Sequence, residues 1–394
     1  MSFLTDRVQR IKPSPTLAVT LRAAELKASG KDIIGLGAGE PDFDTPEHIK
    51  EAAIKALREG QTKYTAVDGT AGLKKAIIHK FERDNSLSYT PKQILVSCGA
   101  KHSLFNLFLA LLQAGDEVII PAPYWVSYPD MALLADAKPV IISAGLDQQF
   151  KITPTQLEAA ITQKTKLLVL NSPSNPTGVA YSKAELQALG AVLLKHPQVW
   201  VVSDDIYEPI WWAKESFNNI LMACPELYDR TIVVNGVSKS YSMTGWRIGY
   251  AAGPIELIGA MSKIQSQSTS NPTSISQAAA QAALDGPQDC VTEMVKAFQQ
   301  RHEFVFNGLA KIPGVQVMRS DGTFYSFPNF QGAMEKLNIA DDIAFAELLL
   351  TQVGVAIVPG SAFGAPGYGR LSFATDLKTL EEAIARIHRA VIGG

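Results

Sequence analysis

The amino-acid sequence predicts an α/β fold with a mostly parallel β-sheet that is covered by helices on both faces. The chain has 394 residues, 46% of them hydrophobic, which is enough for large cores and predicts two or three domains. Short apolar segments alternate with segments of helical periodicity, a pattern typical of parallel sheets buried on both sides. The expected strands are residues 94–98, 117–120, 140–142, 167–170, 199–203, 231–235 and 248–252, and the first helices between them are residues 103–112, 127–134, 155–161 and 184–194.

The charge balance gives no support to a role on nucleic acids or at membrane surfaces. Lys and Arg number 36 against 38 Asp and Glu, the formal net charge is -2, and no long block of one sign occurs. The three cysteines form no Cys-x-x-Cys motif, and the six histidines lack metal-ligand spacing. The N-terminal residues carry charges where a secretory signal has its apolar core. We therefore expect a reduced, soluble, cytoplasmic protein without a metal site.

The N-terminal region is expected to form a helix at residues 17–29 and a short strand at residues 33–36. The turn that follows, at residues 37–44, is rich in glycine and proline. Its glycines raise the alternative of a nucleotide-binding loop. That alternative is weak, because Glu40 and Pro41 stand where the helix of a dinucleotide fingerprint would begin.

A further helix is predicted to begin with Thr45 as its N-cap and to end before Gly60. After it comes Tyr64, an aromatic side chain in a polar loop. Taken by itself, Tyr64 is as consistent with packing on its own surface as with a functional contact.

Several predicted strands are followed at once by polar or aromatic residues. Ligands of parallel α/β sheets bind beyond the carboxyl ends of the strands, so these loops are the expected walls of a binding site. One loop opens a helix, whose free amide hydrogens suit a phosphate. Each residue alone has an ordinary explanation as a turn, cap or core residue, but their common sheet edge favours a site. The candidates are Gly99, Ala100, Lys101, Trp125, Asn175, Asp204 and Tyr207.

Residues 235–252 read NGVSKSYSMTGWRIGYAA and place Lys239 on a loop between two predicted strands. Ser238 precedes this lysine, and Arg247 follows it eight positions later. A lysine amine forms Schiff bases with carbonyl compounds, and a nearby cation or a dry pocket makes it nucleophilic by lowering its pKa. Arg247 is suited to supply that cation or to bind a phosphate. An isolated loop lysine is usually just solvated, whereas this combination predicts a site for a phosphorylated aldehyde.

The C-terminal third predicts a second, smaller α/β unit, which the N-terminal segment completes. Arg370, which opens the last expected strand, is its most notable charge. Helices are expected at residues 274–284, 288–308, 344–351 and 379–392, and strands at residues 324–327, 355–358 and 370–374.

The motif around Lys239, with Trp246-Arg247-Ile248-Gly249-Tyr250 after it, resembles that of the fold-type I pyridoxal-phosphate aminotransferases. Within them the chain is more similar to the bacterial class I aspartate aminotransferases, from residues 13–16 to residues 370–373. The resemblance implies a large domain with a mostly parallel seven-stranded sheet and a smaller α/β domain. We expect the large, cofactor-binding domain at residues 46–285 and the small domain at residues 1–45 and 286–394.

The resemblance implies pyridoxal 5'-phosphate as the cofactor and assigns a role to each candidate. Lys239 would form the Schiff base and then carry the proton between the substrate Cα and the cofactor. Asp204 would keep the ring nitrogen protonated, Asn175 and Tyr207 would hydrogen-bond the phenolic oxygen, and Trp125 would stack on the ring. The residues expected to hold the phosphate are Gly99, Ala100, Lys101, Ser238, Arg247 and Tyr64 of a partner chain.

Substrate binding is implied by the same resemblance. Arg370 would clamp the α-carboxylate through two parallel hydrogen bonds. The animal-type relatives bind the second carboxylate with a partner arginine from a region that here covers residues 265–272 and contains none. In the bacterial subgroup a lysine at the position of Lys101 does this work. Lys12 stands at a position associated with prephenate amination, although a solvated lysine is its more ordinary interpretation. The implied substrate-binding residues are Gly39, Lys101, Trp125, Asn175, Arg370 and Lys12.

The implied function is reversible amino transfer between L-aspartate and 2-oxoglutarate, with oxaloacetate and L-glutamate as products and prephenate as a further candidate acceptor. A homodimer is also implied, in which Tyr64 reaches the neighbouring site. The alternatives are an aromatic or broad-specificity aminotransferase, a lyase on the same fold, and a non-catalytic binding protein. The binding protein is disfavoured because the full set of reactive residues is present. A serine hydrolase is disfavoured because the segment around Ser238 lacks the closing glycine of a nucleophile elbow.

Overall fold

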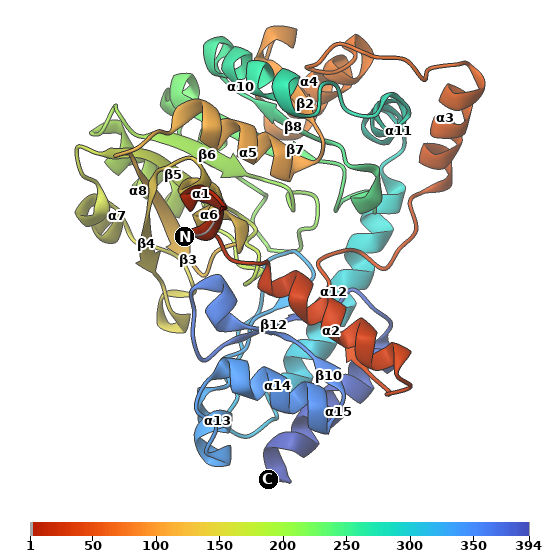
Figure 1. Cartoon of the computed structure of the whole chain (residues 1–394), viewed down its shortest axis with the longest axis vertical. Helices are drawn as coiled ribbons and strands as arrows, with labels where there is room; N and C mark the ends of the chain where they lie inside the picture. Colours follow the sequence, from red (N-terminus) through yellow and green to blue (C-terminus); the bar gives the residue numbers. More distant parts are fainter. Residues whose placement is uncertain (1–2, 394) are drawn as a thin grey trace.

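The computed structural model describes residues 3–393 of the chain (Figure 1). In this part of the chain, seven strands form one large sheet in the order β2-β8-β7-β6-β5-β3-β4. All neighbouring strands are parallel except β8, which runs antiparallel to β2 and β7. The predicted fold class is confirmed, and each of the seven expected segments contains a strand. The strands are β2 (Ile94–Ser97), β3 (Glu117–Ala122), β4 (Lys138–Ser143), β5 (Thr165–Asn171), β6 (Trp200–Asp204), β7 (Thr231–Gly236) and β8 (Gly249–Ala252).

Helices cover both faces of this sheet because its central strands are apolar on both sides. Val201 and Val202 of β6, for example, are both fully buried, and they belong to hydrophobic clusters on opposite faces. One face packs against α5 (Ala100–Leu111), α6 (Ser127–Leu134) and α10 (Ile255–Ser268). The other packs against α3 (Glu47–Arg58), α4 (Ala71–Asn85), α7 (Pro154–Ala160), α8 (Lys183–Leu194), α9 (Ile220–Ala223) and α11 (Ser274–Asp285).

A smaller unit lies at the lower end of the molecule in Figure 1 and has a hydrophobic cluster of its own. The helix α15 shows how it is built, since Leu380, Ala383, Ile387 and Val391 share one buried face at helical spacing. Its strands are β1 (Ile34–Gly35), β9 (Tyr325–Ser326), β10 (Val355–Ala356), β11 (Val358–Pro359) and β12 (Gly369–Ser372). Its helices are α2 (Pro15–Ala28), α12 (Asp289–Leu309), α13 (Gln331–Leu337), α14 (Asp342–Gln352) and α15 (Leu377–Ile392).

The expectation of one strand at residues 355–358 is wrong, because two short strands occupy this segment. β10 pairs in parallel with β1, whereas β11 pairs antiparallel with β12, and Ile357 lies between them. A continuous apolar run does not reveal that its two halves belong to different sheets. The change of sheet matters for the site, since β12 begins with Gly369 and Arg370.

The prediction that Thr45 caps α3 is also wrong. The helix begins at Glu47, and the capping position is Pro46, which offers no side-chain cap. The Thr45 hydroxyl instead donates to the Ser242 carbonyl at 2.6 Å and accepts from the Trp246 indole at 2.9 Å. These long-range bonds hold the loop that carries Lys239, and they outweigh the local capping preference.

Short elements complete the chain. Helix α1 (Asp6–Gln9) lies on α6, and Arg7 and Arg10 form ion pairs with Asp136 at 2.9 and 2.5 Å. The 3-10 helices are η1 (Pro91–Gln93), η2 (Leu146–Gln148), η3 (Pro225–Arg230), η4 (Thr244–Trp246) and η5 (Gly360–Phe363).

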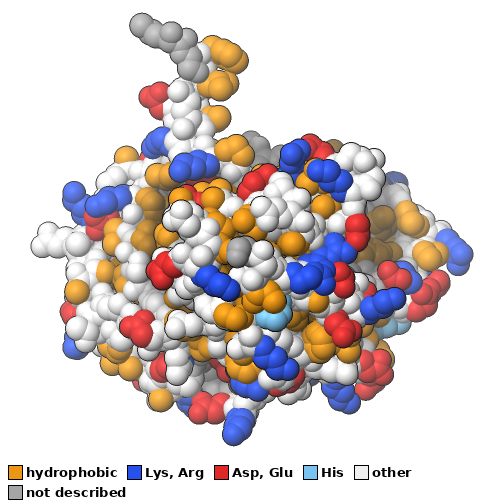
Figure 2. Space-filling view, turned by 90° about the horizontal axis from the view of Figure 1, so that it is seen from below, with side chains coloured by type: hydrophobic (Ala, Val, Ile, Leu, Met, Phe, Trp, Pro, Cys, Tyr) orange, Lys and Arg blue, Asp and Glu red, His pale blue; other side chains and the backbone are white. Residues whose placement is uncertain are grey.

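The surface mixes charges of both signs. On the face shown in Figure 2, Lys and Arg side chains are interspersed with Asp and Glu. Within residues 3–393, no helix combines the length and the apolar character that a membrane crossing requires.

Candidate active site

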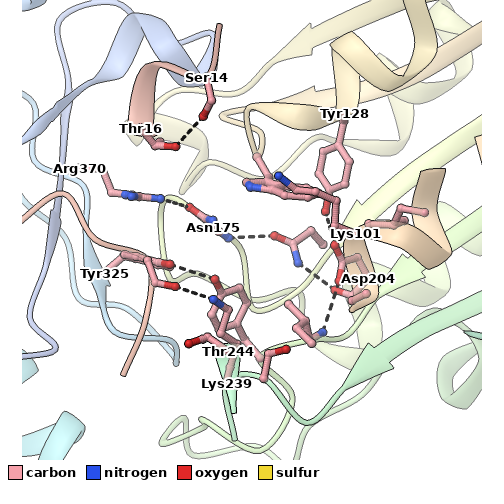
Figure 3. Close-up of a pocket in the computed structure, with 18 of the residues that line it drawn as sticks. Ser14, Thr16, Lys101, Tyr128, Asn175, Asp204, Lys239, Thr244, Tyr325 and Arg370 are labelled. Carbon is pink, nitrogen blue, oxygen red and sulfur yellow. Dashed lines mark hydrogen bonds between the residues drawn. The ribbon is translucent and has the colours of Figure 1, made fainter. Parts of the chain in front are cut away.

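A pocket of about 440 Å³ lies where the carboxyl ends of the parallel strands meet the smaller unit (Figure 3). Its size is in the range of small-molecule sites. Residues from both units line it. The predicted residues among its lining are Gly39, Ala100, Lys101, Trp125, Asn175, Asp204, Tyr207, Ser238, Lys239, Arg247 and Arg370.

Lys239 occupies the loop that follows β7, three residues after the end of the strand. Its ammonium donates to the backbone carbonyl of Gly39, on the turn after β1. Burial lowers the pKa of this lysine to about 8, and the positive charges of Arg370, Arg247 and Lys101 act in the same direction, opposed by Glu40. Neutral amine is therefore accessible near physiological pH, as a nucleophile or a proton carrier requires.

Asp204 ends β6 and is almost completely buried. Its carboxylate accepts from the Tyr128 hydroxyl at 2.6 Å and from the Ile206 amide at 3.4 Å. Burial raises the pKa of Asp204 to about 6, although these bonds and the charge of Lys239 counteract it. A carboxylate in this state gains strongly from a cationic partner, because a nearby positive charge favours the ionised form.

Arg370 lies at the opposite side of the pocket and is 2% exposed. It donates to Asn175 Oδ1 at 2.9 Å and to the Gly37 carbonyl at 2.7 Å, and its guanidinium stacks on the ring of Tyr325 at 4.5 Å. Its buried Nε has no hydrogen-bond partner in the described chain. A buried guanidinium with a free donor suits a carboxylate ligand, since Arg binds such groups in a planar, bidentate way.

Tyr207 connects the large unit to the smaller one across the pocket. Its hydroxyl is 3.0 Å from that of Tyr325. Burial, followed by the neighbouring Tyr325, raises the pKa of Tyr207 well above 10, so the phenol stays neutral. It can therefore donate a hydrogen bond to an anionic ligand atom in the pocket.

A cationic end of the pocket forms around the start of α5. Gly99 precedes this helix with φ +88°, a backbone conformation that favours glycine, and the Arg247 guanidinium lies where a Cβ would be. Arg247 donates to the carbonyls of Thr244 at 2.9 Å and Cys98 at 3.3 Å. Ser238 is buried beside it. The first amides of a helix lack partners inside the helix, so this end suits a phosphate or another anion.

Lys101 extends this cationic region towards the aromatic wall. Its ammonium lies 4.9 Å from the centre of the Trp125 ring. Partial burial lowers the pKa of Lys101, and the charge of Arg247 lowers it further. Lys101 therefore places a cation beside a ring surface that can cover a planar ligand.

Three predicted residues are not part of the pocket lining: Gly99, which directly precedes α5, and Tyr64 and Lys12. Tyr64 is 92% exposed on the loop between α3 and α4. Lys12 is exposed too and lies near Asp130 of α6, whose pKa burial raises and a hydrogen bond from the Lys12 backbone lowers in part. Within the described chain, neither the Tyr64 nor the Lys12 side chain lies with the other site residues.

The sequence reasoning missed several lining residues. Asn171 donates to the Asp204 carbonyl at 2.8 Å and accepts from the Asn175 amide at 2.8 Å. Its place at the end of β5 was a usable signal, because the rule that selected Asp204 selects it as well. Tyr128 and Tyr325 carried no local signal, since aromatic residues at such positions are usually core.

Solved structures show which class of protein this fold and pocket define. The crystal structure of the aspartate aminotransferase from Rhizobium meliloti matches with a TM-score of 0.96 and 49% identity and covers 99% of both chains. That of the Thermus thermophilus enzyme with maleate matches with a TM-score of 0.93 and 43% identity, over 99% of this chain and 100% of that chain. The chain thus has the fold of the fold-type I aminotransferases.

The family itself follows from the sequence comparisons. A model of the family described as aminotransferase class I and II matches residues 31–387. An aspartate/prephenate aminotransferase of Nitrosomonas europaea is 59% identical over 390 residues, which are 98% of each chain. The chain belongs to the class I and II aminotransferase family, and it is an aminotransferase.

The lowered pKa of Lys239 predicts a stability cost of the site. An unfolded lysine titrates near 10.5, so between pH 8 and 10.5 the unfolded chain binds more protons and folding stability rises with pH. Below pH 8 the lysine is protonated in both the folded and the unfolded state, so the full free-energy cost of burying its charge remains. Lys239→Met should therefore stabilise the cofactor-free protein at pH 7 by about 1–3 kcal/mol, and the gain should shrink towards pH 10, as measured by urea denaturation at both pH values.

The exposed Lys263→Met serves as the matched control for this measurement and should change little at either pH. Destabilisation by Lys239→Met at pH 7, or a gain that does not depend on pH, would contradict the prediction.

Proposed function

We propose that the chain is an aspartate aminotransferase that uses pyridoxal 5'-phosphate to transfer the amino group between L-aspartate and 2-oxoglutarate. The observation that carries the proposal is the position of Lys239 in one pocket with Asp204 and Arg370. A lysine of lowered pKa, a buried carboxylate and a buried carboxylate receptor are the three groups this reaction requires. The names of the relatives from Nitrosomonas europaea and Rhizobium meliloti support the same choice.

The residues of the pocket fit the proposed cofactor. Its phosphate suits the cationic end formed by the α5 start, Ser238 and Arg247, where the glycine cradle leaves room. Its ring nitrogen suits Asp204, whose raised pKa reflects a buried carboxylate without a full positive partner. Its aldehyde suits Lys239, and Trp125 offers a flat surface for the ring.

Pyridoxal phosphate supplies an electron sink and a carrier for the amino group when it is bound. Lys239 takes the proton from the substrate Cα as general base and returns a proton as general acid. Asp204 would hold the proton on the ring nitrogen, and Asn175 and Tyr207 would hydrogen-bond the phenolic oxygen. The burial of Asp204 and Tyr207 strengthens these interactions, because charges interact more strongly where water is excluded.

Substrate selection is divided between two cations. Arg370 binds the α-carboxylate, with Asn175 and the backbone at Gly39 beside it. Lys101 binds the second carboxylate of aspartate or glutamate. The Thermus thermophilus structure, described as a complex with maleate, supports a site for a compact dicarboxylate. Prephenate is a further acceptor, supported by the name of the Nitrosomonas europaea relative, and Lys12 at the N-terminal segment serves this activity.

The assembly we propose is a cytoplasmic homodimer in which Tyr64 contacts the phosphate in the neighbouring subunit. The exposure of Tyr64 supports this assignment. We assign residues 46–285 to the large cofactor-binding domain and residues 1–45 and 286–394 to the small domain, of which residues 1–2 and 394 lie outside the part of the chain that the structure describes. The hydrophobic clusters support this division, since those on the large sheet come almost entirely from residues 46–285, and that of the smaller unit comes mostly from the remaining residues.

Replacing Lys239 tests the reaction. Lys239→Ala should lower turnover of aspartate with 2-oxoglutarate by at least about 10⁴-fold, because it removes both the nucleophile and the proton carrier. Oxaloacetate formation measures turnover, and circular dichroism checks folding. A folded Lys239→Ala protein with normal turnover would refute the mechanism.

Aspartate should react faster than phenylalanine or alanine in the unaltered protein. A preference for phenylalanine would favour the aromatic or broad-specificity alternative.

Replacing Arg370 tests the carboxylate receptor. Arg370→Lys keeps the charge but loses the planar pair of donors, so KM for aspartate should rise roughly 10–100-fold with a smaller change in kcat. Steady-state kinetics give the two constants separately. The exposed Arg58→Lys is the matched control. An unchanged KM for Arg370→Lys would place the α-carboxylate elsewhere.

A further inference from the structure

A loop with a firmly held backbone presents one exposed aromatic ring. Residues 59–70 connect α3 to α4, and Tyr64 on this loop is 92% exposed. Removing an aromatic ring from water is energetically favourable. A fixed loop that exposes such a ring to solvent therefore indicates a contact beyond the subunit. The hydrogen bonds that fix this loop therefore bear on function.

The ends of the loop are bound to the body of the subunit. The Ser274 hydroxyl donates to the Gln61 carbonyl at 2.6 Å, and the Val96 amide donates to the Asp68 carbonyl at 3.1 Å. Gly69 has φ +107°, and a Cβ there would lie 2.5 Å from Val96 Cγ2. The loop thus passes against β2 at a distance that only glycine permits.

Gln277 holds the loop next to the exposed ring. It lies on α11, is fully buried, and accepts from the Thr70 amide at 2.8 Å. Its amide nitrogen donates to the Thr65 hydroxyl at 3.1 Å and to the Pro272 carbonyl at 2.9 Å. One buried side chain therefore connects the residue after Tyr64, the end of the loop and the turn before α11.

Gln265 of α10 supports the loop from the other side. It is also fully buried, and its amide nitrogen donates to the carbonyls of Val67 at 2.8 Å and Val96 at 2.7 Å. Its oxygen accepts from Asn106 at 3.0 Å, on the helix α5 whose first turn lines the pocket. The loop is thus joined to the framework that builds the subunit's own site.

We propose that Gln277 is a positioning residue for the active site of the neighbouring subunit, which it affects by fixing the loop that presents Tyr64. The inference rests on the proposed function, in which Tyr64 of one copy contacts the cofactor phosphate in the other. Gln277 is not among the residues that line its own subunit's pocket. Its replacement should therefore weaken cofactor binding across the interface and leave the subunit's own site unchanged.

The physical reason is the ordering of the loop. Gln277→Met keeps the length of the side chain but removes three hydrogen bonds, so the Thr70 amide and the Thr65 hydroxyl lose a partner. A loop released in this way samples more conformations, and that freedom must be removed when Tyr64 binds the phosphate. A merely structural role for Gln277 would lower stability but would affect both sites of a dimer equally.

Hybrid dimers distinguish the two roles. Two differently tagged chains are co-expressed, one with Lys239→Ala, so that each purified hybrid has one working site. Gln277→Met is placed either on the Lys239→Ala chain, across the interface from the working site, or on the working chain itself. After removal of the cofactor, the pyridoxal phosphate concentration that restores half of the activity is measured. Tyr64→Phe in both arrangements calibrates the assay, and Gln281→Met, one turn further along α11, is the matched control.

We expect Gln277→Met to raise the half-activating concentration about tenfold, or about 1.4 kcal/mol, when it lies across the interface, and less than about twofold when it lies on the working chain. Equal effects in both arrangements, or no effect in either, would overturn the proposal. If Tyr64→Phe itself has no effect across the interface, Tyr64 does not contribute to the neighbouring site. That result would contradict the shared site of the proposed function and, with it, the role of Gln277.

A milder variant guards against misfolding. Thr65→Val keeps the shape of the loop side chain and removes only the hydroxyl that Gln277 contacts. It should shift the half-activating concentration in the same arrangement, by a smaller factor. A Thr65→Val shift confined to the working chain would contradict the proposal even if Gln277→Met does not fold.

Discussion

The parallel pairing of β5, β6 and β7 is the constraint on which the site depends. Asn171 pairs with Asp204 in register, and Asp204 pairs with Val234, just before the segment that carries Lys239. Because side chains alternate along a strand, a shift of one residue would turn Asp204 to the other face of the sheet. The residues of β6 are buried on both faces, so packing in the hydrophobic core holds this strand in place and with it the distance between the carboxylate and the lysine.

A buried polar network holds the loops beyond these strand ends. Glu208 forms an ion pair with Lys80, and it accepts from Asn85 and Asn235, each at 2.7 Å. All four residues are buried. A buried pair of this kind contributes little net stability, but removing one partner is costly because the other charge is left unpaired. The network thereby joins the turn that follows Asp204 to the end of the strand that leads to Lys239.

Sequence reasoning reached the fold and much of the pocket for a physical reason. The ends of strands are encoded locally in the sequence, so the rule that ligands bind beyond the carboxyl ends of strands identified Asp204 and the loop of Asn175. Lys239 was identified by the residues next to it. Tyr325 was not predictable, since it reaches the pocket only through the packing of the smaller unit and is stacked on Arg370. Thr45 was misassigned because a local cap and a long-range hydrogen bond have the same sequence signature.

The visible absorption spectrum of the purified protein, loaded with pyridoxal phosphate and recorded before and after addition of aspartate, tests the central claim most directly. We predict a band of protein-bound pyridoxal phosphate that gives way to that of the pyridoxamine form, as the proposed roles of Lys239, Asp204 and Arg370 require. A protein that stays colourless with pyridoxal phosphate would contradict the assignment of the pocket. A coloured protein indifferent to aspartate would keep the cofactor and reject the substrate.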